Sequence, residues 1–378
     1  MSGAYTITER ADGRFFARIN IGRDKNGRIK YKSIYGRTKK EVKEKIRAFT
    51  TDLDNYGKPL DNTSITLSEW TYKHLFTNIH QTVSASTFER YMSIYNTHIK
   101  DSVIGHMKVK DIQQMHLQHY LNEKKSLSKS SLKKIYELLN NSFKFAISNN
   151  LIRINPITEV KLPSSEVKAK EIEILTIDEQ KAYMNALDNC RLKILFMTLL
   201  YTGMRIGEAM ALKWDNVDFD NATITVCESF KKVKQYESDG SSINVALTKA
   251  PKTTKGNRLI PIPTSLVFEL KKFKLSSANN KNGLVFCSRN GTPLEYNTIR
   301  RSHLSTCQKA NIRVVTIHAL RHTFATRSIE AGIDVKTVSE LLGHASIEIT
   351  LNTYVHSTDN SKKAAASTIE KLYQSLLS

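Results

Sequence analysis

The sequence predicts a multidomain protein that is mainly α-helical and carries small β-sheets. Its 378 residues are enough for two or three domains. Two stretches of linker composition, residues 55–66 and 155–173, divide the chain. Between them apolar residues recur at helical spacing, whereas the alternation typical of strands is confined to short segments. We therefore expect three domains, at residues 1–57, 64–158 and 170–378.

The charge of the chain indicates a polyanionic partner. Lys and Arg number 57 against 36 Asp and Glu, which gives a formal net charge of +21. The first sixty residues are the most basic, with 15 Lys and Arg against 7 Asp and Glu. Nucleic acid is the default partner of a protein with such an excess, and an anionic membrane is the alternative.

Several classes of protein are disfavoured by the sequence. The longest apolar run, residues 194–201, is far too short to span a bilayer, and the first ten residues lack the apolar centre of a signal peptide. The four cysteines lie far apart without a CxxC pair, so neither structural zinc nor a disulfide framework is expected. These features are typical of a cytoplasmic protein.

The N-terminal residues predict a small sheet backed by one helix. Residues 14–20 and 28–35 alternate polar and apolar side chains on either side of a DKNG turn, and helical spacing follows over 38–53. Arg28, Lys30 and Lys32 fall on one face of the second strand. A ribbon of this kind fits a DNA major groove, although scattered lysines more often form a solvated surface.

The middle of the chain predicts a bundle of four helices. Segments 69–80, with Ser68 as its cap, and 87–99 are followed by a third helix from Asp111 to about Glu123. The fourth begins at Ser128 or Ser130 and carries one apolar stripe. Lysines gather around the last junction and can form either a phosphate-tracking patch or a solvated face: Lys124, Lys125, Lys129, Lys133 and Lys134.

Residues 170–378 form a segment large enough for a hydrophobic core of its own. Its patterns predict a mixed α/β domain, in which helices precede a set of strands and return after them. The expected helices are 177–188, 190–201 and 205–213, and the expected strands are 223–227, 243–248 and 258–262.

This last domain offers the groups that cleavage of a phosphodiester without metal requires: a nucleophile, cations for the non-bridging oxygens and an acid for the leaving oxygen. His318 and Arg321 lie on one face of the first turn of a helix capped by Thr316, where an anion is attracted. Arg205 and Glu208 begin another helix after a Thr–Gly turn. Each pair, taken alone, can also be a surface pair.

Two further stretches complete the set. A helix over 335–342 stops at Gly343, and His344 and Tyr354 follow, although a tyrosine in such a place is more often part of a core. A flexible lysine-rich turn, TKAPKTTKGNRLIPIP, supplies lysines that can reach a site as a general acid, or that simply keep a hairpin tip soluble.

Taken together and in this order, these motifs resemble the tyrosine recombinase (phage integrase) family. Its pattern is an Arg, a Lys in a β-hairpin turn, HxxR, LLGH and a nucleophilic Tyr. The matching stretches are YTGMRIGEAMALKW, PKTTKGNRLIPIP, IHALRHTFAT and LLGHASIEITLNTYVH. The helical segment is similar to the core-binding domain of the family. The N-terminal segment is similar to the three-stranded-sheet-plus-helix arm-binding domain of integrases from conjugative transposons and temperate phages.

The resemblance implies a role for each matching residue. Tyr354 would be the nucleophile that forms a 3′-phosphotyrosine, and Arg205 and Arg321 would clamp the scissile phosphate. His318 would assist proton transfer from the tyrosine, and His344 would hydrogen-bond the phosphate. Lys252, preferred over Lys249 and Lys255, would protonate the leaving 5′ oxygen.

The implied activity is site-specific recombination of DNA that integrates and excises a mobile element, with no metal and no cofactor. The partners would be double-stranded DNA at core and arm sites, three more copies of the chain in a tetramer, and possible accessory proteins, namely an excision factor and a host DNA-bending protein. Two alternatives remain open, a type IB topoisomerase-like relaxation of DNA and a non-catalytic DNA-binding regulator.

Overall fold

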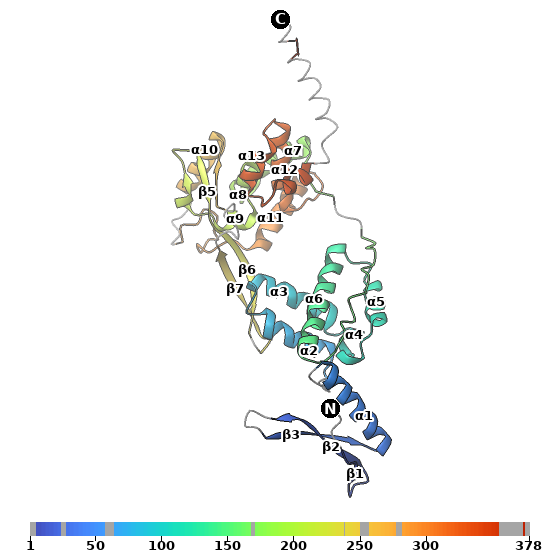
Figure 1. The fold of residues 1–378 in the computed structure, drawn as a ribbon. Coiled ribbons are helices and arrows are strands. Elements are labelled where there is room, and N and C mark those ends of the chain that lie inside the picture. Colours follow the sequence, from blue (N-terminus) through green and yellow to red (C-terminus); the bar gives the residue numbers. More distant parts are fainter. Residues whose placement is uncertain are drawn as a thin grey trace. The chain divides into compact units, whose positions relative to one another are not determined.

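The computed structural model describes residues 5–23, 28–56, 64–167, 171–237, 239–249, 257–276, 282–354 and 373–374, with the backbone alone at 22–23, 52–56, 249 and 352–354. The chain forms two compact units. Unit 1 contains residues 1–169 and 235–242, and unit 2 contains residues 170–234 and 243–378. Figure 1 shows their helices and strands.

A three-stranded antiparallel sheet and one helix form the first part of unit 1, as predicted. The strands are β1 (Thr8–Glu9), β2 (Phe15–Arg23) and β3 (Ile29–Gly36), in the order β1-β2-β3, and the helix is α1 (Lys39–Tyr56). Ala17, Ile19 and Ile34 pack with Val42 and Ile46 of α1 in a small core. Burial of these side chains holds the sheet to the helix.

Both faces of β3 carry exposed side chains. Side chains two residues apart share a face of a strand. Lys30 and Lys32 therefore lie on the side of Ile34, which is buried towards α1. The opposite face carries Tyr31 and Tyr35, which are 59% and 44% exposed. The helix covers this face at Ile34, whereas Lys30 and Lys32 remain exposed, and their contact with DNA stays a prediction.

The second part of unit 1 is the predicted helical bundle. Its main helices enclose one core, which contains Trp70, Phe88 and Phe143. The first helix begins two residues earlier than expected, because Thr66 and not Ser68 forms its capping box, with Glu69. The helices are α2 (Leu67–His74), which continues as a π-turn to Ile79, α3 (Ala85–Ile94), which continues to Ile99, α4 (Val103–His106), α5 (Gln114–Asn122) and α6 (Lys129–Ser148).

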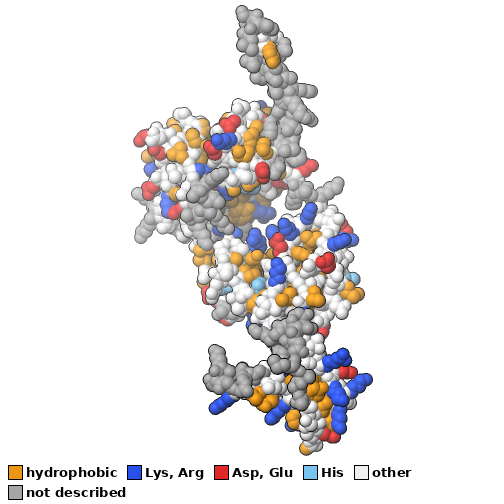
Figure 2. Space-filling model, in the orientation of Figure 1, with side chains coloured by type: hydrophobic (Ala, Val, Ile, Leu, Met, Phe, Trp, Pro, Cys, Tyr) orange, Lys and Arg blue, Asp and Glu red, His pale blue; other side chains and the backbone are white. Residues whose placement is uncertain are grey.

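Lysines line the start of α6, where the sequence placed a cluster. Lys129, Lys133 and Lys134 are exposed there, and Ser128 caps the helix as predicted. Lys125 is also exposed. Figure 2 shows Lys and Arg side chains spread over the visible face of the bundle.

Unit 2 is built around α8 (Lys193–Thr202), whose apolar residues are buried almost all round. A three-stranded antiparallel sheet in the order β4-β5-β8 and several helices complete its core. The strands are β4 (Val217–Asp218), β5 (Thr223–Val226) and β8 (Arg258–Pro261). The other helices are α7 (Ile177–Ala186), α9 (Ile206–Ala211), α10 (Thr264–Ser276), α11 (Tyr296–Lys309), α12 (Ile317–Glu330), α13 (Val335–Leu342) and α14 (Ile347–Tyr354).

One pair of strands was only half expected. β6 (Ser229–Tyr236) and β7 (Ser242–Lys249) form a separate two-stranded sheet, and only the second of them was predicted. The sequence of β6, SFKKVKQY, alternates weakly and carries three lysines, so its pattern resembles a solvated loop. Within unit 1, Tyr236 packs its ring edge-on against Phe88, and its carbonyl oxygen lies 2.9 Å from Nε2 of His80.

Candidate active site

The first turn of α12 carries two of the predicted site residues. The helix begins after Thr316, whose backbone is extended at the N-cap, although its side chain makes no capping hydrogen bond. His318 is exposed on this turn, whereas Arg321 is buried and only 3% exposed. A buried guanidinium needs partners for its N–H groups, and the partners of Arg321 identify the rest of the site.

One partner lies in the last turn of α13, residues Leu341–Gly343, which we call the carbonyl turn. Gly343 ends the helix in the left-handed conformation at φ 65°, and the backbone N–H groups of Gly343 and His344 bond back into the helix. The last carbonyl groups of a helix have no partner within it. In the carbonyl turn they are left to accept from other elements.

Three arginines donate to three successive carbonyl oxygens of this turn. The helix C-terminus carries partial negative charge, so cations are stabilised there. The arginines come from α12, from the residue before α9 and from β8, which are far apart in the sequence. The bonds are Arg258 Nε to Leu341 O at 2.6 Å, Arg321 Nη2 to Leu342 O at 2.8 Å, and Arg205 Nη2 to Gly343 O at 3.3 Å.

Arg321 also donates to the end of α8. Its Nη1 lies 2.8 Å from the carbonyl oxygen of Gly203, which ends α8 at φ 60°. A Cβ atom at this position would lie 2.4 Å from Phe324 Cδ1 and 2.6 Å from Leu342 Cδ2. Glycine is therefore required both by its backbone conformation and by the packing around it, and the predicted Thr–Gly turn is confirmed.

Glu208 joins two of the arginines. Its Oε1 accepts from Arg205 Nη1 at 2.9 Å, and its Oε2 accepts from the Arg205 backbone N–H at 2.8 Å and from Arg258 Nη2 at 2.7 Å. The carboxylate is 5% exposed. Burial by itself would raise the pKa of Glu208, but the hydrogen bond and charge of Arg258, followed by those of Arg205, hold it below its usual value.

His344 leaves the carbonyl turn with a fixed ring. Its Nδ1 lies 2.8 Å from Thr350 Oγ1 on α14, and Thr350 is fully buried. Burial, with the charges of Arg321 and Arg205, lowers the pKa of His344 to about 3, so the imidazole is neutral at neutral pH. If Thr350 donates to Nδ1, the Nε2–H group of His344 is free to donate to a ligand.

A second histidine stands beside His318. The ring of His322 meets the ring of His318 edge-on, with their centroids 4.6 Å apart. Loss of solvation, with the charges of Arg321 and Arg205, lowers the pKa of His318, and burial lowers that of His322 to about 4. Both rings are thus neutral near pH 7.

The site has an excess of buried positive charge. Arg258 pairs with Glu208, and the same carboxylate binds Arg205, so one negative charge serves two arginines. The hydrogen bonds of Arg321 go to two carbonyl oxygens and to no carboxylate in the described part of the chain. Burial and the neighbouring arginines lower the pKa of Arg321 to about 9, so it still carries its proton at neutral pH. A bound anion would offset this charge.

The structure brings together four of the six residues that the sequence singled out. Arg205, His318, Arg321 and His344 lie in one region of unit 2. Lys252 lies outside the described residues. Tyr354 ends α14, which packs against α12 and α13, but its side chain is also outside what the structure describes.

Sequence reasoning missed two residues of this region. Arg258 was not considered, although an arginine that opens an apolar strand directly after the lysine-rich turn is an unusual choice that could have drawn attention. Thr350 gave no usable signal, because a threonine in a short amphipathic helix has no specific meaning. Glu208, which the sequence placed beside Arg205, accepts from the Arg205 guanidinium and backbone N–H.

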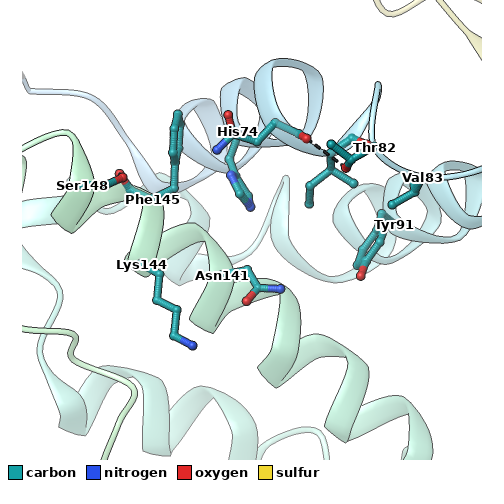
Figure 3. Close-up of a pocket in the computed structure, with 10 residues that line it drawn as sticks. His74, Thr82, Val83, Tyr91, Asn141, Lys144, Phe145 and Ser148 are labelled. Atoms are coloured by element: carbon teal, nitrogen blue, oxygen red, sulfur yellow. Dashed lines mark hydrogen bonds between the residues drawn. The ribbon is translucent and has the colours of Figure 1, made fainter.

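Other features of the described residues lie away from this region. They contain no group of three or more His, Cys, Asp or Glu side chains placed to hold a metal ion. None of the helices found among them is long and apolar enough to cross a membrane. A groove of about 460 Å³ in the bundle of unit 1 is lined by His74, Lys144 and Phe145 among others (Figure 3).

Comparison with known proteins decides the family. The model described as "Phage integrase family" matches residues 173–361, and the one described as "Phage integrase, N-terminal SAM-like domain" matches residues 66–125. The chain belongs to the phage integrase family. This family member is 31% identical over 374 residues to a protein named "Tyrosine recombinase XerC-like" from Caldanaerobacter subterraneus, with 94% of this chain and 95% of that protein covered.

Two further likenesses concern mobile elements. The ICEBs1 integrase of Bacillus subtilis is 25% identical over 304 residues, with 75% of this chain and 77% of the integrase covered. The solved structure of the Tn1549 transposon integrase in complex with a circular-intermediate DNA superposes with a TM-score of 0.65 at 22% identity, and covers 81% of this chain and all of that one. At this identity the superposition shows the shared fold, which is the tyrosine recombinase fold that the sequence predicted.

Proposed function

We propose that this phage integrase family member is a site-specific DNA recombinase that integrates and excises a mobile element. The observation that carries the proposal is the excess of buried positive charge at the carbonyl turn. Arg321 is held by two carbonyl oxygens and has no carboxylate partner among the described residues. A guanidinium has more N–H groups than these two bonds use. A phosphodiester is an anion with two non-bridging oxygens, which two guanidinium groups bind well.

The proposed reaction breaks and forms one ester bond at a time. The oxygen of Tyr354 attacks the phosphorus, the 3′-phosphotyrosine bond forms, and the bond to the 5′ oxygen breaks. The tyrosine proton leaves as attack proceeds, with assistance from His318, and Lys252 gives a proton to the leaving 5′ oxygen. A 5′ hydroxyl of the partner strand then attacks the phosphorus and gives up its proton, the bond to Tyr354 breaks, and the tyrosine oxygen regains a proton as the phosphodiester is restored. Because each ester is close in energy to the one it replaces, no external energy source is required.

The remaining site residues stabilise charge on the transferring phosphate. Arg205 and Arg321 bind its non-bridging oxygens, and His344 donates from Nε2 while Thr350 holds its Nδ1. The arginines are fixed before DNA arrives, so little reorganisation is needed as charge develops. Loss of one oriented donor of this kind lowers the rate by roughly a hundredfold or more.

The other parts of the chain would hold the DNA. The exposed lysines at the start of α6 would contact the phosphates of a core site, and the N-terminal sheet would bind an arm site. Two strand exchanges in series need four active sites, so we propose a tetramer on two duplexes. An excision factor and a host DNA-bending protein would assist, and the reaction would take place in the cytoplasm of a bacterial host.

The decisive experiment traps the covalent adduct. A suicide substrate carrying the element's own core site is incubated with the protein, and adducts are resolved on a denaturing gel. Tyr354→Phe should bind the site with unchanged affinity and form no adduct, because the nucleophilic oxygen is missing. Tyr373→Phe is the matched control and should still form the adduct, because Tyr373 is exposed and is not one of the proposed catalytic residues. An adduct that persists in Tyr354→Phe refutes the proposal.

A further inference from the structure

Arg258 is the one arginine of the carbonyl turn to which no role in phosphate binding has been given. It opens β8, six residues after Lys252 in the sequence. Its side chain is 6% exposed, and its hydrogen bonds include one from Nε to the carbonyl oxygen of Leu341 and two to the carboxylate of Glu208. The guanidinium therefore faces protein and not solvent.

These bonds connect Arg258 to both halves of the proposed phosphate site. Arg258 donates to the carboxylate of Glu208 at 2.7 and 3.2 Å. The same carboxylate accepts from the side chain and from the backbone N–H of Arg205. Leu341, to which it donates at 2.6 Å, begins the turn that leads to His344. One side chain thus fixes the distance between the carboxylate that orients Arg205 and the turn that carries His344.

We propose that Arg258 is a positioning residue for DNA cleavage, an inference that rests on the function proposed above. It sets the geometry of Arg205 and His344 through Glu208 and Leu341, without touching the DNA. Glu208 in turn has its charge shared between two arginines, which leaves part of the positive charge of Arg205 for the phosphate. A displacement of about 1 Å at a reacting centre can lower a rate on the order of a hundredfold.

This role predicts a particular kinetic signature. Because Arg258 is buried against Glu208, its loss should not weaken the encounter with DNA. It should lower the rate at which the bound, aligned phosphate is cleaved. A residue that contacts DNA would instead change the half-saturating DNA concentration, and a residue that only stabilises the fold would lower the fraction of active protein and leave the rate constant unchanged.

The test measures single-turnover formation of the covalent adduct at a series of DNA concentrations. Arg258→Met should lower the maximal rate constant by about 10- to 100-fold and leave the half-saturating DNA concentration within about twofold. Arg258→Lys should recover part of the loss, because it keeps the charge but cannot grip the carboxylate and the carbonyl together. Arg313→Met is the matched control, since Arg313 also bonds a glutamate, Glu179, and a backbone carbonyl, that of Ile174.

A second comparison covers the case in which Arg258→Met folds poorly because Glu208 is left unpaired. Arg258→Met with Glu208→Gln removes both charges of the buried pair, which costs less stability than removing one. If Arg258 acts through Glu208, the double variant should cleave at about the rate of the slower single variant. Multiplied effects in the double variant would refute this route. A rate close to that of the unsubstituted protein would show that Arg258 only neutralises Glu208 and does not position the site.

The outcomes separate this inference from the proposed function. If the unsubstituted protein forms no adduct, or forms one without Tyr354, the proposed function fails and the inference falls with it. If the adduct forms through Tyr354 but Arg258→Met cleaves at the rate of Arg313→Met, the function stands and the inference alone is wrong.

Discussion

The glycine at the end of α8 provides a quantitative test of how the site is built. Gly203 has φ 60°, and a Cβ atom there would come within 2.4 Å of Phe324 and 2.6 Å of Leu342. Gly203→Ala should therefore cost about 1–2 kcal/mol for the left-handed backbone and about 1–3 kcal/mol more for the packing. The free energy of unfolding of unit 2 should fall by roughly 2–5 kcal/mol in total.

Gly283 is a matched control in the same unit. Its φ is 62°, but no atom lies within 4 Å of the place where a Cβ would be. Gly283→Ala should cost only the backbone part, about 1–2 kcal/mol. Chemical denaturation is followed by the fluorescence of Trp214, which lies in unit 2, in a Trp70→Phe background that removes the other tryptophan. Equal losses for the two alanine variants would refute the packing argument.

Gly203→Ala should also affect catalysis, since the carbonyl oxygen of Gly203 accepts from Arg321 at 2.8 Å. Side-chain clashes with Leu342 would move the second carbonyl that holds the same guanidinium. We expect the rate of adduct formation to fall in the fraction of protein that remains folded, whereas Gly283→Ala should leave that rate unchanged.

Three further predictions concern single residues. His74 is buried, neither ring nitrogen has a partner among the described residues, and burial lowers its pKa to about 4. As the pH falls from about 6.5 to 4, the unfolded chain binds a proton that the folded chain resists, so the free energy of unfolding should fall by up to about 3 kcal/mol. A denaturation series in which His74→Phe shows the same dependence on pH would contradict this. Thr350→Val should lower the rate of adduct formation about tenfold, whereas Thr350→Ser should keep the normal rate, because a hydroxyl is needed to hold Nδ1 of His344. Equal rates for the two variants would count against this contact. Lys252→Ala should slow cleavage of DNA with an ordinary 5′ oxygen at the scissile phosphate but not of DNA with a 5′-phosphorothiolate, whose sulfur leaves without a proton. If Lys255→Ala gives this pattern instead, the general acid is Lys255.

The sequence was sufficient for the features that depend on local patterns. The apolar spacing predicted α6 and α8, and the glycines at 203 and 343 marked helix ends that the structure confirms as left-handed turns. These signals are local because a helix end requires a particular backbone conformation of its own residue. The motifs also identified the family, which the comparisons establish.

Features that depend on contacts between distant residues could not be predicted. Nothing local to Arg258 indicates that its guanidinium meets Leu341, 83 residues away in the sequence, or that Glu208 is buried. For the same reason the sequence could not show that Ile34, on the same face of β3 as Lys30 and Lys32, packs against α1. The missed strand β6 carries a polar pattern because a two-stranded sheet has little core to fill.

The most direct test of the whole account identifies the residue that carries the DNA. The trapped adduct is digested with protease and nuclease, and the modified peptide is sequenced by mass spectrometry. Of the 15 tyrosines in the chain, the account predicts that Tyr354 alone bears the nucleotide, linked through its 3′ phosphate. A nucleotide on any other residue, or a 5′ linkage, would contradict the assignment of the site.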